Sequence, residues 1–290
     1  GDWSSDVCSS DLTDNGTARG REIYNAGMRG QKGSEYDGGH RVPFLVHWPR
    51  GGMASKREVD TLCHAVDIAP TLLDLIGAEA PAGYRFDGVS IKSLLAGTGG
   101  ADWPERMLVT DSQRVRDPIK WKQSAVMSQG WRLVNGKELY HIDEDPAQEK
   151  DLAGKYPDRV AKMRAFYEAW WAELEPTFAR TTELHLGHED HPVVTLTSHD
   201  WIQEAYPPWN QAQNRNKQPV HPLRLNIKHE GHWAVKVLHE GTYEVEVRRW
   251  PEESGKKINE ELPPGDDVPG ADQDRKSTRL NSSHQIISYA

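Results

Sequence analysis

Two short loops of this sequence carry side chains that could do chemistry. Residues 13–17, "TDNGT", place the carboxylate of Asp14 beside the amide of Asn15 and follow them with a glycine. Oxygen donors of these two kinds suit a hard cation such as calcium, although the same three residues also make an ordinary turn. Residues 30–43, "GQKGSEYDGGHRVP", place Lys32 between glycines. Such a lysine is either a solvated surface charge or a point charge directed at an anion.

Several histidines invite a functional interpretation, and each has a simpler one. His40 lies close enough to Lys32 in sequence to reach a common ligand, but we expect it to hydrogen-bond within its own loop. The segment "HLGHEDH" groups His185, His188 and His191 like metal ligands. Their spacing fits no standard zinc site, so we interpret the segment as a polar linker.

Other polar and aromatic residues are assigned to structure in the same way. We expect Asp67 and Asp74 to lie at the start and on the exposed face of one helix. His199 and Asp200, in "LTSHDW", could face a substrate, but a turn into the next domain is the simpler interpretation. Four tryptophans could stack on sugar rings, but buried aromatic residues of a β-module are more common; they are Trp201, Trp209, Trp233 and Trp250.

The two ends of the chain predict no globular element. The ends are residues 1–12, "GDWSSDVCSSDL", and 274–290, "DRKSTRLNSSHQIISYA"; one oligonucleotide can encode residues 2–11 on one strand and 274–283 on the other. We therefore interpret both ends as translated sequencing adaptor and exclude them from the fold prediction. Without them, Cys63 is the only cysteine, so no internal disulfide can form.

The remaining residues, 13–273, are mildly acidic. The whole chain has a net charge of −9, and the excluded ends carry −3 and +2, which leaves −8. This balance argues against a nucleic-acid-binding surface. No apolar run approaches the length needed to span a bilayer, so we expect no membrane span. The segment is long enough for more than one compact unit.

The elements that must position the two loops form a first region, residues 13–103. "VPFLVHW" reads as a buried strand, and "DIAPTLLDLIGA" as a short helix with Pro70 near its start and Gly77 as its stop. "FDGVSIKSLLAG" reads as a turn followed by another short helix. This alternation of strand and helix indicates the end of an α/β sheet.

Two further regions follow. Residues 104–180 predict a strand, "RMLVTD", then two hairpin strands around an Asn135–Gly136 turn, then a helix with apolar residues on one face. This is a small antiparallel α+β subdomain. Residues 192–262 predict a β-sandwich-like module, in which "HWAVKVLHEGTYEVEVRRW" forms a hairpin turning at Glu240–Gly241 and strands such as "LRLNIKH" precede it.

The order of these motifs resembles that of a known family. "TDNG", then "RGQKGSEYDGGHRVPFLVHWP", "CHAVDIAPTLLDLIGA", "FDGVSI" and "WRLVNGKELYHIDEDPAQEKDLA" resemble the type I, formylglycine-dependent sulfatases of the alkaline-phosphatase superfamily. The resemblance covers about residues 13–175. It implies the C-terminal part of an alkaline-phosphatase-like α/β/α sandwich, and hydrolysis of a sulfate monoester of a small molecule or carbohydrate.

The resemblance also implies roles for three residues. Asp14 and Asn15 would supply two ligands to one divalent cation, Ca²⁺ in most of the family, and Lys32 would contact the sulfate ester. A cation and a fixed ammonium can together stabilise the charge that develops as the alcohol departs. Because these enzymes are commonly exported, the family further implies a periplasmic or extracellular location.

The sequence also departs from the family pattern. The formylglycine nucleophile is made from a Cys or Ser in a Cys/Ser-x-Pro-x-Arg motif, which does not occur here, and "TLCHAVD" around Cys63 does not match it. We therefore expect the downstream part of an enzyme, inactive alone, with the formylglycine in a part that precedes it. Two alternatives stay open: a phosphodiesterase or phosphonate hydrolase of the same superfamily, and a non-catalytic carbohydrate-binding protein.

Overall fold

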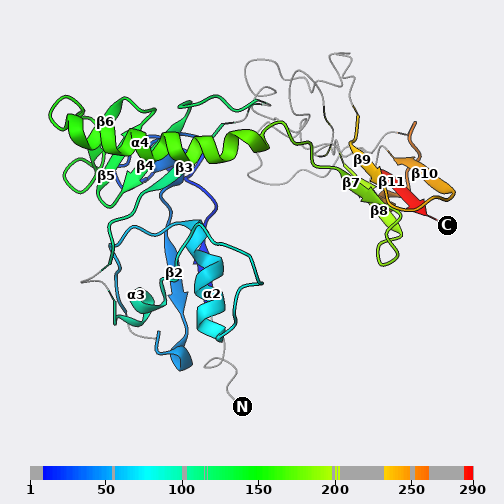
Figure 1. The fold of residues 1–290 in the computed structure, drawn as a ribbon, viewed down its shortest axis with the longest axis horizontal. Coiled ribbons are helices and arrows are strands. Elements are labelled where there is room, and N and C mark those ends of the chain that lie inside the picture. The colour runs from blue at the N-terminus through cyan, green and yellow to red at the C-terminus, as the bar shows by residue number, and fades with distance from the viewer. Residues whose placement is uncertain are drawn as a thin grey trace. The chain divides into compact units, whose positions relative to one another are not determined.

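The computed structural model of the chain describes residues 9–53, 56–99, 103–113, 115, 117–197, 200, 202, 232–248, 252–260 and, as backbone, 284–289. It divides into two compact units, Gly1–Gln113 with Ile119–Leu174, and Arg114–Pro118 with Glu175–Ala290. Figure 1 shows the helices and strands of both units.

The first part of the first unit mixes short helices with one pair of strands. Its elements are β1 (Ser9–Leu12), α1 (Asp37–His40), β2 (Phe44–His47), α2 (Ile68–Ile76) and α3 (Lys92–Ala96). Helix α2 ends where Gly77 adopts a left-handed conformation with φ 69°, as the sequence predicts. The predicted strand, the two predicted helices and the general α/β character are confirmed.

Strand β2 is less buried among the described residues than its continuous apolar run indicates. Among the described residues β2 pairs only with β1, in antiparallel register, whereas a layered parallel sheet would bury both faces of such a strand. Leu45 of β2 is 64% exposed, and Leu72 and Ile76 of α2 are 50% and 73% exposed. The apolar runs predicted for β2 and α2 are present, but no described neighbour covers these three side chains fully.

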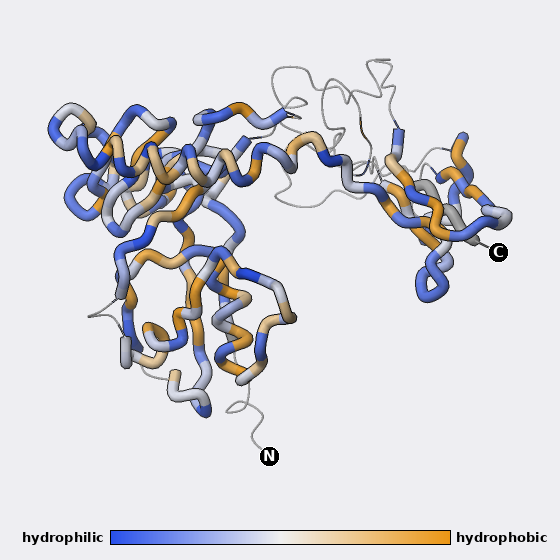
Figure 2. The backbone as a smooth tube through the Cα atoms, viewed as in Figure 1, coloured by the Kyte–Doolittle hydropathy of each residue, from blue (hydrophilic) through white to orange (hydrophobic). Residues whose placement is uncertain are grey.

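The second part of the first unit is an antiparallel sheet covered by a long helix. The sheet order is β3 (Leu108–Asp111), β4 (Ser124–Ser128), β5 (Trp131–Val134) and β6 (Glu138–His141). Helix α4 (Pro157–Leu174) packs against it, and polar and apolar residues alternate along the helix (Figure 2). Six side chains at most 4% exposed form the core: Val126, Leu133, Leu139, Met163, Tyr167 and Trp171.

This core explains why α4 forms here. Met163, Tyr167 and Trp171 recur every four residues and therefore lie on one face of the helix. The Asn135–Gly136 turn is confirmed, with φ of 50° and 67° at the two residues. The number of strands differs from the prediction, because a second turn at Gln129 (φ 44°) and Gly130 divides the first predicted strand into β4 and β5.

The second unit contains two small sheets. Strand β7 (Leu184–Leu186) pairs in parallel with β9 (Val235–Val237). Strands β8 (Val193–Leu196) and β10 (Tyr243–Arg248) both pair with β11 (His284–Tyr289). The predicted hairpin of residues 232–250 is therefore wrong, because its two strands pair elsewhere. Alternation specifies the two faces of a strand but not its partner.

Both excluded ends contribute strands, since β1 lies within residues 1–12 and β11 within 274–290. The predicted strand "LRLNIKH" lies outside the described residues. Short 3-10 turns occupy Gly20–Glu22, Pro49–Gly51, Ala65–Asp67, Glu175–Thr177 and Glu252–Ser254. No helix in the described part of the chain is long and apolar enough to cross a bilayer.

Candidate functional site

The loop that carries Lys32 turns back on itself between two glycines. Gly30 and Gly33 have φ of 89° and 84°, a left-handed conformation that residues with a side chain adopt only with strain. The amide of Ser34 donates to the carbonyl of Gln31 at 2.8 Å, which closes the turn. The backbone thus presents Lys32 at the tip of a tight turn, with its side chain exposed.

The loop that carries Asp14 and Asn15 lies directly against the Lys32 loop. The amide of Gly16 donates to the carbonyl of Gly39 at 3.0 Å, and the amide of Lys32 donates to the carbonyl of Thr17 at 3.0 Å. A Cβ atom at Gly16 would collide with the carbonyl oxygen of Gly38. The structure therefore joins, through the backbone, the two loops that the sequence placed fifteen or more positions apart.

A buried ion pair fastens the Lys32 loop to the antiparallel sheet. Arg132 of β5 donates from Nε to Oδ1 of Asp37 at 2.9 Å, and the two side chains are 5% and 1% exposed. The amide of Asp37 also donates to Oε1 of Gln148 at 2.9 Å. Burial lowers the pKa of Arg132, and the charge of Asp37 opposes that effect.

A second group of contacts holds the same loop from its other end. Arg29 stacks over the ring of Tyr36, with 3.8 Å from the guanidinium carbon to the ring centroid. Tyr36 and Tyr140 both donate to Oε2 of Glu138, at 2.8 Å and 2.7 Å. Burial and the Glu138 carboxylate raise the pKa of Tyr36, and raise that of Tyr140 to about 12. Both phenols therefore stay protonated and keep donating at neutral pH.

His40 serves its own loop, as predicted. Its Nε2 lies 3.3 Å from the carbonyl oxygen of Glu35 and 3.8 Å from Oδ1 of Asp37. Burial lowers the pKa of His40, although the Asp37 carboxylate works against the shift. The imidazole of His40 therefore supports the segment from Glu35 to Asp37.

The calcium site implied by the resemblance is only partly present among the described residues. Asp14 is exposed and Asn15 half-buried, so their oxygens are accessible. However, calcium takes about six to eight oxygen ligands, and no group of three or more His, Cys, Asp or Glu side chains in the described residues could hold a metal ion. Asp14 and Asn15 therefore supply only part of a calcium ligand set.

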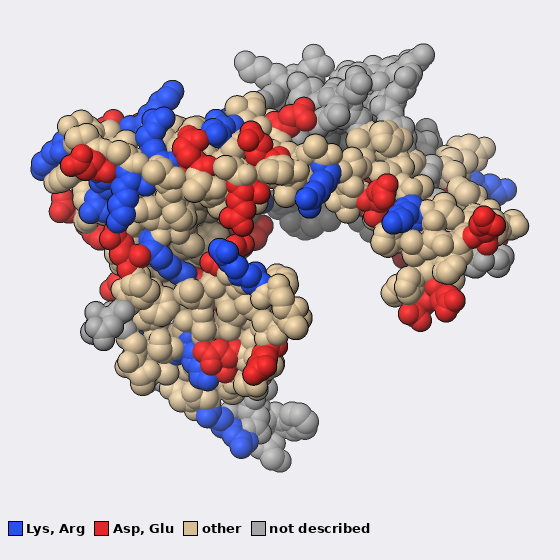
Figure 3. Space-filling model, in the orientation of Figure 1, with Lys and Arg blue, Asp and Glu red and all other residues tan. Residues whose placement is uncertain are grey.

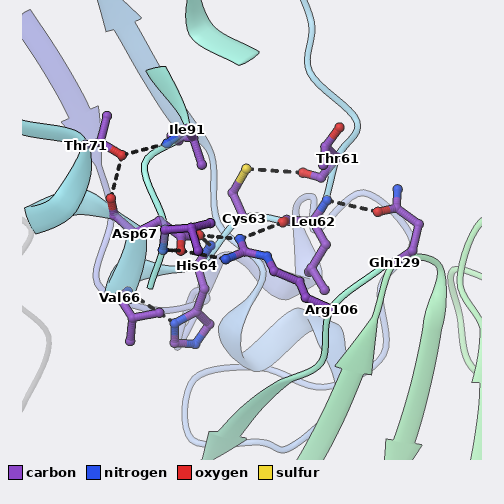
Figure 4. A network of polar contacts seen from close by, with 11 residues as sticks. Thr61, Leu62, Cys63, His64, Val66, Asp67, Thr71, Ile91, Arg106 and Gln129 are labelled. Carbon is purple, nitrogen blue, oxygen red and sulfur yellow. Dashed lines mark hydrogen bonds and ion pairs between the residues drawn. The ribbon is translucent and has the colours of Figure 1, made fainter. Parts of the chain in front are cut away.

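Cys63 belongs to a structural network (Figure 4). Its thiol donates to the carbonyl of Thr61 at 3.3 Å, and burial raises the pKa of the thiol, which lowers the fraction of reactive thiolate. Beside it Arg106 donates from Nη1 to Oδ1 of Asp67 at 2.7 Å and from Nη2 to Oδ2 at 2.5 Å. Burial alone would raise the pKa of Asp67, but the hydrogen bond from Arg106 and those from the backbone amides of Val89 and His64 lower it.

Asp67 precedes α2, as predicted, but its side chain pairs with Arg106 instead of capping that helix. Asp74 is exposed, as predicted, and its carboxylate lies 3.0 Å from Nζ of Lys92. These two residues therefore have structural roles.

The remaining candidates do not gather into a site. His188 and His191 face each other across an isolated bridge, with ring centroids 5.8 Å apart, and His185 lies on β7. Asp200 accepts from the amide and hydroxyl of Thr197, both at 2.8 Å, which closes a turn. His199 and the residues Trp201, Trp209 and Trp250 lie outside the described residues.

The anchoring residues Arg132, Gln148 and Arg29 were missed by sequence reasoning. Gln148 and Arg132 lie 111 and 95 positions from Asp37. Nothing in the local pattern marks Arg132, which looks like one polar residue of an alternating strand. A positive φ at Gln148 (50°) is equally invisible in the sequence.

A family model and two curated relatives match parts of this chain. The family model for N-sulphoglucosamine sulphohydrolase, C-terminal, matches residues 31–166, which include Lys32 but not Asp14 or Asn15. Human arylsulfatase G is 41% identical over 66 residues, 23% of this chain and 12% of that protein. A sulfatase of Formosa agariphila is 28% identical over 177 residues, 54% of this chain and 32% of that protein.

Solved structures are also similar to this chain. The crystal structure of Ps i-CgsB in complex with k-i-k-neocarrahexaose matches 56% of this chain and 36% of that chain, with a TM-score of 0.47 and 22% identity. The chain spans between about an eighth and a third of the two curated relatives named above. The matched family model and these relatives support a sulfatase family, within the hydrolases, for this chain.

Proposed function

We propose that this chain forms the downstream part of a sulfatase that hydrolyses a sulfate monoester. The observation that carries the proposal is the junction of two loops, in which the Gly16–Gly39 and Lys32–Thr17 hydrogen bonds hold the Asp14 turn against the Lys32 turn. Two oxygen donors and one ammonium group then lie on neighbouring backbone segments. The match of residues 31–166 to a sulfatase family model supports the same assignment.

Lys32 binds and orients the sulfate in this proposal. An ammonium group on a tight turn needs little reorganisation when charge develops on the ester oxygens, and a preorganised charge of this kind lowers the barrier of the chemical step. The buried Asp37–Arg132 pair and the Arg29–Tyr36 stack hold the turn from both ends. These contacts fix the position of Lys32 without touching the substrate.

Asp14 and Asn15 provide two oxygen donors for a divalent cation, with Ca²⁺ as the proposed ion. The ion would neutralise charge on the sulfate oxygens when bound. The nucleophile is a formylglycine carried by sequence outside these 290 residues, in which no Cys/Ser-x-Pro-x-Arg motif occurs. On the family resemblance alone, we extend the proposal to a sulfated small molecule or carbohydrate as substrate and to a periplasmic or extracellular location.

The experiment compares ester classes in a protein that contains this chain together with the upstream sequence of its gene. We expect hydrolysis of 4-nitrophenyl sulfate well above that of bis(4-nitrophenyl) phosphate, and we expect the upstream sequence to contain Cys/Ser-x-Pro-x-Arg. Preference for the phosphate diester would assign the chain to the phosphodiesterase branch. Hydrolysis of neither ester would favour a non-catalytic carbohydrate-binding protein.

A further inference from the structure

A hollow of about 530 Å³ opens beside the Lys32 loop and is lined mainly by cationic and amide side chains. Its lining comes from the segment that enters β4, from the β5–β6 turn and from the Lys32 loop itself: Glu35, Lys120, Trp121, Lys122, Gln123, Asn135 and Lys137. Glu35 lies three positions after Lys32 on the same loop. One lining residue of the hollow and the proposed sulfate contact therefore lie on the same loop.

The charge of the hollow is unbalanced. Three lysines face one glutamate among the lining residues, whereas charges of both signs are interspersed over the face of this unit that Figure 3 shows. Lys120 pairs with Glu168 at 2.8 Å. The exposed side chains of Lys122 and Lys137 make no hydrogen bond or ion pair with any residue that the structure describes. A concave surface of one sign raises the local concentration of counter-ions.

The one carboxylate in the hollow is already engaged. Asn135 donates from Nδ2 to Oε1 of Glu35 at 2.8 Å. Gln123 donates from Nε2 to the carbonyl of Gly33 at 3.4 Å, which ties the hollow to the Lys32 turn a second time. The carboxylate of Glu35 is therefore engaged by Asn135, and the ammonium groups of Lys122 and Lys137 can bind a ligand.

The backbone at the rim is strained. Trp121 and Gln123 have φ of 64° and 50°, a region that is unusual for residues other than glycine and especially for bulky ones. The amide of Trp121 donates to the hydroxyl of Tyr167 at 3.0 Å and its indole to Glu168 at 2.8 Å. Strained conformations of this kind cluster at active sites and ligand clamps.

We propose that this hollow binds a second anionic group, a sulfate or carboxylate, of a sulfated oligosaccharide. Lys122 and Lys137 contact the anion, and the indole of Trp121 provides an apolar wall beside the sugar ring. The inference rests on the proposed function in one respect: the oligosaccharide in the hollow is taken to be the one whose sulfate ester lies at Lys32. Binding in the hollow itself can be measured without turnover.

The test is a calorimetric titration of the complete 290-residue chain with a dextran sulfate oligosaccharide, at an ionic strength of about 0.15 M, which screens distant charges. A neutral dextran oligosaccharide of the same length is the second probe. We expect the sulfated probe to bind and the neutral one not to bind. Failure of the sulfated probe to bind, or equal binding of the two, would overturn the proposal.

Two double variants then locate the binding. Lys122→Gln with Lys137→Gln should weaken binding of dextran sulfate about ten-fold, which corresponds to about 1.4 kcal/mol. Lys150→Gln with Lys155→Gln removes the same charge from exposed positions outside the hollow and should leave affinity nearly unchanged. Equal losses in the two double variants would mean non-specific attraction of a polyanion and would refute the site.

A Lys32→Ala background separates this inference from the proposed function. Because contacts at separate positions contribute nearly additively, the Lys122 and Lys137 substitutions should reduce affinity by the same factor with or without Lys32. Ester hydrolysis depends on Lys32 and reports on the proposed function alone. An effect of the hollow substitutions that vanishes in the Lys32→Ala background would contradict a separate subsite.

Discussion

Replacing Asp37 with asparagine should loosen the whole candidate site, although this residue contacts no substrate in our proposal. The substitution keeps the shape of the side chain and removes its charge. Arg132, 4% exposed, would then lose the carboxylate that lies 2.9 Å from its Nε. The amide oxygen of the substituted side chain remains as a neutral acceptor, and the other acceptors of Arg132 are the carbonyl oxygens of Gln129 and Trp131, at 2.6 Å and 2.9 Å.

The magnitude follows from the burial of the pair. Removing one partner of a buried ion pair costs about 3–5 kcal/mol, because the other charge stays buried without compensation. The two carbonyl groups left to Arg132 place the expected loss at the lower end, about 3 kcal/mol. With a urea dependence of about 2 kcal/mol per molar, the unfolding midpoint should fall by about 1.5 M.

The assay is hydrogen exchange by mass spectrometry across a urea series, followed in peptides from β4 to β6 and from residues 29–41. These peptides report on the first unit alone, which a whole-chain signal would mix with the second. Asp74→Asn is the matched control, since it breaks an ion pair whose two side chains are each 45% exposed. We expect that control to unfold close to the wild-type midpoint, because exposed pairs contribute little.

The double variant Asp37→Leu with Arg132→Met completes the design. Replacing a buried ion pair with apolar side chains is often neutral, so the double variant should regain most of the midpoint lost in Asp37→Asn. Equal midpoints for Asp37→Asn and Asp74→Asn would refute the reasoning, since burial would then make no difference to the pair.

Four further outcomes are expected. In a catalytically competent protein that contains this chain, Lys32→Ala should lower kcat/KM about 100-fold or more with an unchanged melting temperature, and normal turnover would make Lys32 a surface charge. Asp14→Ala should weaken calcium binding measured by titration, and an unchanged affinity would remove it from the ligand set. Gly16→Ala should accelerate exchange in residues 29–41, since its Cβ would collide with the neighbouring loop; wild-type exchange would contradict that packing. Burial lowers the pKa of His40 and of His64, so the stability that they contribute is complete above the unfolded value of about 6.5 and is lost as pH falls through their folded pKa values; urea midpoints equal at pH 7.5 and pH 5 would argue against this.

Local patterns were sufficient to predict most of the helices and strands of the first unit. The glycine that ends α2, the Asn135–Gly136 turn and the four-residue spacing in α4 each act within a few residues, so the sequence shows them directly. The same locality explains why the two candidate loops could be recognised, since glycines, a lysine and oxygen donors lie side by side in the chain.

Strand pairing was less predictable, because the alternation of polar and apolar residues in a strand does not specify which strand it pairs with. The alternation of residues 232–250 is nearly perfect, yet β9 pairs with β7 and β10 with β11. A continuous apolar run likewise predicts a buried strand, but Leu45 is 64% exposed, because burial depends on which elements surround the strand.

By itself, then, the sequence determined which residues could bind an anion or a cation, where the backbone must turn and which helix face is apolar. Only the tertiary structure decided that the Asp14 and Lys32 turns share backbone hydrogen bonds, that Arg132 reaches across 95 positions to hold Asp37, and that three lysines line one hollow. The reason is physical: turns and helix faces are set by neighbours in the chain, whereas a buried charge or a shared cavity depends on which distant segments fold against each other.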